Sequence, residues 1–285
     1  MRWEGARQST NIQDRRGISG GGMIGGGGIG MLLLVLLISF ITGRNPLELL
    51  SQVDEVNPAS TEQQAPTGAA PASDEQARFV GAVLADTEDT WNRVFASRNA
   101  QYEEPVLVLF DGSVQSACGF ASAAVGPFYC PGDHKLYLDL SFFRDLAQRF
   151  GAPGDFAQAY VVAHEVGHHV QTLLGVSEQV HRARSRAGET AANALQVRME
   201  LQADCLAGVW GHHANQRQML ESGDIEEGLR AAAAIGDDRL QRESQGYVAP
   251  ESFTHGSSAQ RASWLRRGLE TGDINACDTF NADLR

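Results

Sequence analysis

The residues best suited to chemistry in this sequence are two histidines and a glutamate in the run His164-Glu165-Val166-Gly167-His168. On a helix, residues four apart lie one above the other, so both imidazoles can bind one metal ion. Glu165 follows the first histidine and can accept a proton from a water molecule beside that ion. The alternative is a fortuitous match on an ordinary helix, but the apolar residues 159–163 that lead into the run favour a buried metal-binding helix. The spacing therefore predicts metal-assisted hydrolysis.

A third metal ligand must come from elsewhere, because a catalytic zinc ion usually has three protein ligands and an open position. In one known zinc-binding pattern, a glycine and a third histidine follow the pair by three and six residues. Gln171 and Leu174 occupy those two positions here, so that pattern is excluded. The segment Glu200-Leu201-Gln202-Ala203-Asp204 places two carboxylates on one helix face within a mostly apolar stretch. A solvated acidic face is the alternative, but buried acids need partners. We predict Glu200 as the third ligand and Asp204 as the acceptor for an imidazole N–H.

The remaining histidines carry weaker signals. His169 points away from the metal-binding face by about a hundred degrees and is expected to be structural. His181, His212 and His213 could serve as ligands in principle, but they are expected to be polar surface residues. His134 opens a strand candidate and has no evident partner. His255 lies in the turn Phe253-Thr254-His255-Gly256 before a capped helix, a place suited to an exposed functional imidazole. From spacing alone, a surface histidine is the simpler reading of His255.

The composition of the 285-residue chain fits a globular protein with a core, since 42% of its residues are hydrophobic and 20% are charged. The formal net charge is −12. That charge argues against a nucleic-acid binder that relies on neutralising phosphates. The first sixteen residues differ, because four arginines and two acidic residues give them a local charge of +2.

A membrane segment is expected near the N-terminus. No charged residue lies between Arg16 and Arg44, and residues 23–42 are predominantly apolar. A helix of this length rises by about 1.5 Å per residue and matches a hydrocarbon core of about 30 Å. A cleaved signal peptide is the alternative, but the stretch ends without a small-x-small cleavage site, so an uncleaved transmembrane helix is favoured. Since the arginines precede it, residues 1–22 are expected in the cytoplasm and the rest outside the cytoplasmic membrane, as in a single-pass protein with a periplasmic domain.

Residues 43–72 are rich in Pro, Ala, Ser, Thr and Gln without an apolar period, which predicts a flexible linker. Residues 73–285 then predict one domain, opened by an amphipathic helix whose capping pair is Ser73 and Gln76. Strands are expected at 106–110 and 135–139, and helices at 141–150, 155–174, about 187–219, about 222–245 and 258–271. The capping pairs expected for the second and last of these helices are Asp155 with Gln158 and Ser257 with Gln260. This layout is α+β, mostly helical with a small β-sheet, preceded by one transmembrane helix.

Taken together, the chain resembles the bacterial neutral zinc metallopeptidase family, a membrane-anchored branch of the zincins. The resemblance covers most of the chain apart from the linker and rests on the blocks MRWEGARQSTNIQDRRG, GPFYCPGDHKLYLDLSFF, AYVVAHEVGHHVQ, ELQADCLAGVW and THGSSAQRASWLRRGLETGDINACDTF. It implies a zincin-like fold, one zinc ion per chain and a protein or peptide substrate. In gluzincin-like peptidases the glutamate of an ExxxD helix is the third zinc ligand, which falls on Glu200 here, with Asp204 supporting a histidine. The resemblance also implies that His255 stabilises an oxyanion.

Four cysteines allow two disulfide bonds in three possible pairings. We favour Cys118 with Cys130, which would join the strand region, and Cys205 with Cys277, which would tie the Glu200 helix to the C-terminal tail. Their spacing matches no zinc knuckle, so a structural zinc site built from thiolates is not expected. Disulfides fit an extracytoplasmic compartment.

These observations lead to one expected mechanism. Zinc held by His164, His168 and Glu200 activates a water molecule, Glu165 accepts its proton as general base, and His255 donates to the oxyanion. An extended substrate is expected to pair with the strand near 134–139. Two alternatives remain: a zinc-stabilised binding module without catalysis, against which Glu165 speaks, and a zinc amidase acting on cell-wall amide bonds, which would use the same residues.

Overall fold

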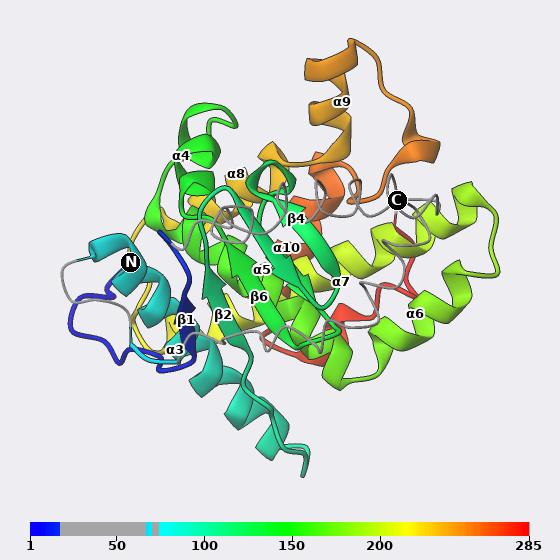
Figure 1. The fold of residues 1–285 in the computed structure, drawn as a ribbon. Coiled ribbons are helices and arrows are strands. Elements are labelled where there is room, and N and C mark those ends of the chain that lie inside the picture. Colours follow the sequence, from blue (N-terminus) through cyan, green and yellow to red (C-terminus); the bar gives the residue numbers. More distant parts are fainter. Residues whose placement is uncertain (18–66, 70–73, 285) are drawn as a thin grey trace, which may run out of the picture.

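The computed structural model describes residues 1–17, 67–69 and 74–284 (Figure 1). Its main sheet has four strands in the order β1 (Ile12–Asp14), β2 (Val106–Leu109), β6 (Lys135–Leu138) and β5 (Phe128–Cys130). β1, β2 and β6 are mutually parallel, and β5 is antiparallel to β6. A separate hairpin consists of β3 (Ser113–Ser116) and β4 (Gly119–Ser122).

The two predicted strands form the centre of this sheet. Leu107, Val108 and Leu109 are each at most 1% exposed, as expected for a parallel strand covered on both faces. The strand near 134–139 is β6, and it pairs with β2 on one side and β5 on the other. The expectation that this strand pairs with substrate is therefore wrong, because the hydrogen-bonding groups on both of its edges already have partners. The edge on that side of the sheet belongs to β5, which the sequence analysis did not predict.

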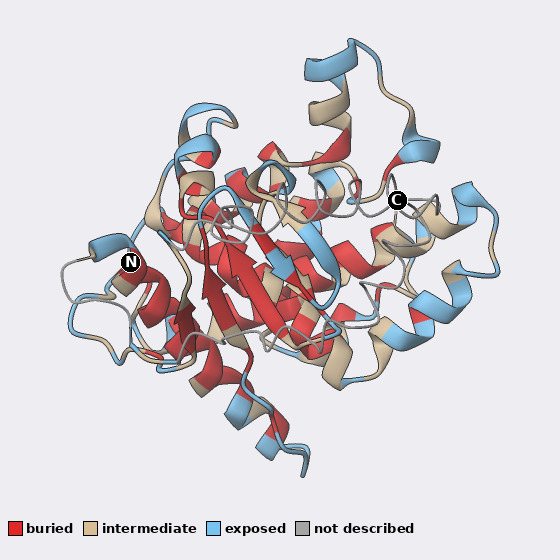
Figure 2. Cartoon of the chain, in the orientation of Figure 1, coloured by how far each residue is buried: buried red, intermediate tan, exposed pale blue. Residues whose placement is uncertain are grey.

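Helices make up most of the described chain and cover the sheet. Their bounds are α3 (Glu75–Ala96), α4 (Ser141–Gln148), α5 (Asp155–Leu173), α6 (Val176–Arg184), α7 (Glu189–Gln216), α8 (Asp224–Ala234), α9 (Asp237–Gln245) and α10 (Ser258–Thr271), with short 3-10 turns at Ala123–Val125, Pro250–Ser252 and Ile274–Cys277. Figure 2 shows that buried residues gather in the sheet and in the helices behind it. The fold is thus a mostly helical α+β unit with a small mixed sheet, as predicted.

Several helix boundaries differ from the sequence-based expectation. The N-cap of α3 is Asp74, whose side chain accepts a hydrogen bond from the Ala77 N–H, and not Ser73. α5 begins after Gly154 without a side-chain cap, so the expected pair of Asp155 with Gln158 does not form. By contrast, the capping box of Ser257 with Gln260 at the start of α10 is confirmed.

One expected helix is interrupted, and one helix was not expected. The region about 222–245 holds α8 and α9 with a break at Ile235 and Gly236. The helix expected at about 187–219 is the continuous α7, and α6 is an additional helix that precedes it. Alanine content alone does not locate such breaks, because they depend on where the chain must turn to reach its next partner. Here the Asp237 N–H donates to the Gly256 carbonyl, 2.9 Å away, in the turn before α10.

α7 and α10 pack closely through glycine. A Cβ on Gly208 would lie 2.2 Å from the Leu265 carbonyl oxygen, and a Cβ on Gly268 would lie 2.0 Å from that of Cys205. These distances are far below van der Waals contact, so only glycine permits the two helix backbones to approach this closely. The approach matters for the site below, since α7 carries Glu200 and Asp204.

Residues 1–17 are part of the same folded unit. β1 pairs with β2, with Ile12 opposite Leu107 and Asp14 opposite Leu109. The structure therefore corrects the boundary that separated residues 1–22 from a domain beginning at residue 73: strand pairing holds β1 about 4.8 Å from β2. The predicted transmembrane helix at 23–42 lies outside the described residues, as does most of the linker at 43–72. In the part of the chain that the structure describes, no helix has the length and hydrophobicity to span a bilayer.

Both favoured disulfides are present in the structure. Cys118 is bonded to Cys130, and Cys205 is bonded to Cys277. Because disulfides persist in oxidising compartments, they indicate an extracytoplasmic location for this unit.

Removing the bridge between α7 and the C-terminal turn should destabilise the fold measurably. The sequence separation of Cys205 and Cys277 is 72 residues, for which chain entropy gives a stabilisation of about 4 kcal/mol. We expect the double variant Cys205→Ala/Cys277→Ala to lose that much free energy of unfolding in a urea titration. The matched control, Cys118→Ala/Cys130→Ala, opens a separation of 12 residues and should lose about 3 kcal/mol. Wild-type stability in the first variant would contradict the prediction.

Candidate metal centre

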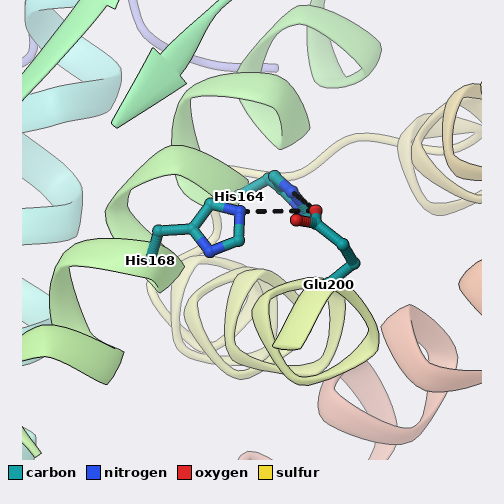
Figure 3. Close-up of side chains that lie close together, drawn as sticks. All are labelled: His164, His168 and Glu200. Atoms are coloured by element: carbon teal, nitrogen blue, oxygen red, sulfur yellow. Dashed lines mark hydrogen bonds and ion pairs between the residues drawn. The ribbon is translucent and has the colours of Figure 1, made fainter. Parts of the chain in front are cut away.

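α5 and α7 cross at a glycine, and this crossing assembles the site. A Cβ on Gly167 would lie 2.9 Å from the Ala203 carbonyl oxygen and 3.1 Å from the Ala203 Cα. The fourth residue of the His-Glu-Val-Gly-His run therefore permits the two backbones to approach, and the histidines on either side of it face α7. Figure 3 shows His164 and His168 of α5 turned towards Glu200 of α7.

His164, His168 and Glu200 converge on one point. Nε2 of His164 lies 3.2 Å from Glu200 Oε2, and Nε2 of His168 lies 3.4 Å from the same oxygen. One ligand atom from each of the three residues lies within 4.8 Å of the others. The sequence predicted both histidines from their spacing and Glu200 from its apolar surroundings, and the structure brings all three together.

The other nitrogen of each imidazole is held by a hydrogen-bond acceptor. Nδ1 of His164 donates to Asp204 Oδ1 at 2.8 Å, and Nδ1 of His168 donates to Gln171 Oε1 at 2.9 Å. With Nδ1 protonated in each ring, both Nε2 lone pairs are directed to the shared point. The contact predicted for Asp204 is present. The contact of Gln171 was missed, although its place three residues after His168 on the same helix could have indicated it.

Asp204 is the centre of a buried network that reaches a third helix. Arg261 of α10 donates to Asp204 through Nε and Nη2 at 2.9 and 3.0 Å, and the Tyr160 hydroxyl donates to Asp204 Oδ1 at 2.6 Å. Asp204 is fully buried and Arg261 is 3% exposed. Neither partner was predicted from the sequence. An arginine on the apolar side of α10 was the available signal, because a buried charge requires a partner.

The carboxylates and imidazoles of this site shift one another's pKa values. Burial alone would lower the pKa of His164, but the charge of Asp204 and hydrogen bonds to Asp204 and Glu200 outweigh burial and raise that pKa to about 10. Burial would raise the pKa of Glu200, but the adjacent imidazoles hold it well below its usual value. An environment that stabilises a proton on the imidazole also stabilises a metal cation at the same position.

The donor set fits zinc. Two imidazole nitrogens and one carboxylate are a common ligand set of catalytic zinc ions, and hydrogen-bonded imidazoles are the form that binds zinc. Among the described residues, the group at this point contains three donors, the number that leaves one position open for water or substrate.

Glu165 lies beside the histidines on α5 and borders a small hollow. The hollow is lined by apolar residues that include Pro127, Leu136 and Val161. Burial raises the pKa of Glu165, and the neighbouring histidines only partly offset that rise. A carboxylate whose pKa is raised towards neutrality is suited to accept a proton and release it again.

His255 lies in the turn before α10 and is held by a residue that the sequence analysis did not name. Its Nδ1 lies 3.2 Å from Asp237 Oδ1, and its side chain is 51% exposed. Asp237 Oδ2 accepts the backbone N–H groups of Thr254, His255 and Gly256 at 2.7, 2.6 and 3.1 Å. Burial would raise the pKa of Asp237, but these hydrogen bonds and the adjacent imidazole lower it. The carboxylate is thus fixed by the backbone and in turn orients the imidazole.

The other histidines lie outside this group. His169 is fully buried, with Nε2 2.6 Å from the Glu103 carbonyl oxygen and Nδ1 3.1 Å from the Tyr129 hydroxyl. Burial lowers its pKa to about 4, in agreement with the structural role expected for it. In the described chain, the metal-binding groups also do not include His134, His181, His212 or His213.

A second group of acidic residues consists of Asp155, Asp224 and Glu227. The amino group of Met1 lies 2.5 Å from Asp155 and 3.3 Å from Asp224. The positive charge of this amino group therefore lies within the acidic cluster and offsets part of its negative charge, and we assign no metal site to it.

Comparison with known proteins places these features in a family. The family model described as "Putative neutral zinc metallopeptidase" matches residues 1–280. The uncharacterized protein YpfJ of Escherichia coli K12 is 47% identical over 289 residues, covering 100% of both chains. The uncharacterized protein Mb2605 of Mycobacterium bovis is 42% identical over 260 residues, covering 86% of this chain and 85% of that protein. No solved structure matches the chain. With both histidines, the glutamate between them and the distant Glu200 in place, the chain belongs to the neutral zinc metallopeptidase family.

Proposed function

We propose that this protein is a zinc-dependent peptidase that works outside the cytoplasm. The observation that carries the proposal is the convergence of His164, His168 and Glu200 on one point, with Glu165 next to His164 on the same helix. A purely structural metal site has no use for a carboxylate base next to the ion and is usually closed by four protein ligands.

The chain's own residues divide the work of hydrolysis. Zinc held by His164, His168 and Glu200 would act as a Lewis acid: it would polarise a carbonyl and lower the pKa of a water molecule to about 7. Glu165 accepts the proton of the attacking water and passes it to the departing amine. Asp204 and Gln171 keep the imidazoles in the tautomer that directs Nε2 to the ion.

His255 is the proposed donor to the tetrahedral oxyanion. The turn that carries it packs on α7, where a Cβ on Gly256 would lie 3.2 Å from Leu201 Cδ2, beside Glu200 in sequence. Nδ1 of His255 donates to Asp237, so Nε2 can donate to a substrate when the imidazole also carries its second proton. Donors of this kind are worth about a hundredfold or more in rate.

The proposed substrate is a protein or peptide. We propose further that the apolar residues 23–42 attach the protein to the cytoplasmic membrane. The disulfides support an extracytoplasmic placement of the catalytic unit.

A digest of a mixed peptide library by the purified full-length protein tests the proposal. We expect cleavage that stops when a chelator removes the metal and returns when zinc is restored, with about one zinc per chain. Cell-wall fragments serve as a parallel substrate. Hydrolysis of cell-wall amides without peptide cleavage would replace the peptidase with an amidase, whereas zinc binding without hydrolysis of either substrate would reduce the site to a structural one.

A further inference from the structure

The N-terminal segment contacts the catalytic unit along its whole described length. The Leu107 N–H donates to the Asn11 carbonyl at 2.8 Å, and the Arg15 N–H donates to the Leu109 carbonyl at 2.8 Å. Ile12 is 2% exposed, so the short strand buries its apolar side chain as well. In Figure 1 this segment lies along the sheet edge beside β2. These are the contacts of a structural strand of the sheet rather than of a loosely attached tail.

Side chains near the start of the chain add to this attachment. Trp3 packs edge-on against Phe79 of α3, with ring centroids 5.5 Å apart. Glu88 of α3 is 1% exposed, and it accepts the Ser9 hydroxyl at 2.5 Å and the Asn11 amide at 3.0 Å. A buried carboxylate on α3 therefore depends on the N-terminal segment for its partners.

Two arginines of this segment form ion pairs with acidic residues of the folded unit. Arg7 lies 2.9 Å from both Glu88 and Asp89, and Arg16 lies 2.6 Å from Asp14 and 2.5 Å from Asp74. These charges supported the expectation that the N-terminus stays in the cytoplasm. Their ion pairs with the folded unit provide a different reason for basic residues at these positions.

Gly17 and Gly68, which precede and follow the stretch outside the described residues, lie at the same edge of the sheet. Gly17 follows β1, and its N–H donates to Asp111 just after β2 at 2.9 Å. Gly68 forms an antiparallel bridge with Ile12, donating to the Ile12 carbonyl at 2.9 Å. Residues 17 and 68 therefore both lie at the edge of the sheet formed by β1. A single crossing of a bilayer would instead separate them by a hydrocarbon core of about 30 Å.

We propose that residues 1–17 lie on the same side of the membrane as residues 74–284. The chain that contains the apolar stretch then begins and ends at one edge of the catalytic unit. The N-terminus is consequently extracytoplasmic wherever the disulfide-bonded unit is extracytoplasmic. This proposal is independent of the peptidase activity, because it rests on strand pairing and ion pairs remote from the zinc ligands.

Thiol labelling in cells tests the placement directly. All four native cysteines are in disulfides, so an introduced cysteine is the single free thiol. Glu4→Cys reports on the N-terminal segment, and Glu270→Cys, also at an exposed position but on α10, is the matched control. Each full-length variant is expressed in bacterial cells, which are then converted to spheroplasts. The spheroplasts are treated with a membrane-impermeant maleimide before and after permeabilisation.

Equal labelling of the two variants before permeabilisation is the expected result. Labelling of both only after permeabilisation would also place them on one side, while contradicting the extracytoplasmic location. Labelling of Glu270→Cys in intact spheroplasts, with Glu4→Cys reached only after permeabilisation, would overturn the proposal.

A second measurement examines the packing without reference to a membrane. A protease site is inserted within residues 43–66 of the full-length protein, which carries an affinity tag at its C-terminus. After cleavage in mild detergent, the N-terminal fragment should remain bound to the tagged fragment. The matched variant Arg7→Glu/Arg16→Glu, which places like charges beside Glu88, Asp89, Asp14 and Asp74, should lose most of that retention. Complete release of the wild-type fragment would overturn the proposal.

Discussion

Glu165→Gln should lower kcat for peptide hydrolysis by about 10²–10⁴-fold, the usual contribution of a general base. Glutamine has the same size and shape but cannot accept the proton of the attacking water. The proposed zinc ligands His164, His168 and Glu200 are unchanged, so the variant should still bind about one zinc per chain. The loss must therefore appear in turnover and not in metal content. Steady-state kinetics on a peptide found in the library digest, with elemental analysis of the same sample, measures both quantities.

The control for this variant is Glu270→Gln, which makes the same chemical change at an exposed position of α10. Its kinetics and zinc content should equal those of the wild type. Unchanged cleavage by Glu165→Gln would remove Glu165 from the mechanism. Loss of zinc together with activity would mean that Glu165 acts through metal binding instead.

Arg261→Met should reduce the free energy of unfolding of the metal-free protein by about 3–5 kcal/mol, which is the usual cost of removing one partner of a buried ion pair. Arg261 donates two hydrogen bonds to Asp204, which is fully buried. Methionine fills part of the space but leaves that carboxylate without its cation. Asp204 also orients His164, so zinc affinity should fall by about 10–100-fold. Urea unfolding and a competitive zinc titration measure the two effects separately.

Two further variants separate charge from packing. Arg266→Met makes the same substitution at an exposed position of α10 and should change stability by no more than about 0.5 kcal/mol. Arg261→Lys keeps the charge but loses the two-pronged geometry of the guanidinium, so its stability should fall between wild type and Arg261→Met. Equal stability of Arg261→Met and Arg266→Met would show that the buried pair contributes nothing.

Where the relevant residues share one helix, the sequence was sufficient. His164 and His168 are four apart on α5, and Glu200 and Asp204 are four apart on α7. In each case the regular rise and rotation of the helix fixes which side chains share a face. The Ser257 and Gln260 cap of α10 is local in the same sense, because its donors and acceptors lie within one turn.

Tertiary structure decided which faces meet. The three-residue strand β1 has no apolar alternation to identify it, and β5 is equally short. Nothing local links Arg261 to Asp204, which is 57 residues away in sequence. Likewise the N-terminal arginines indicate a membrane orientation until their ion pairs with the folded unit are seen, such as Arg7 with Glu88 and Arg16 with Asp74.

The amino-acid sequence by itself thus predicted the residues of the candidate metal site: a histidine pair, a glutamate between them and a carboxylate on a second helix. Those features depend on spacing within single helices, which backbone geometry sets. Only the tertiary structure decided which residues hold the side chains of the metal site and where the N-terminal segment lies. The reason is that a buried charge or a strand edge takes its partner from whichever distant segment can reach it.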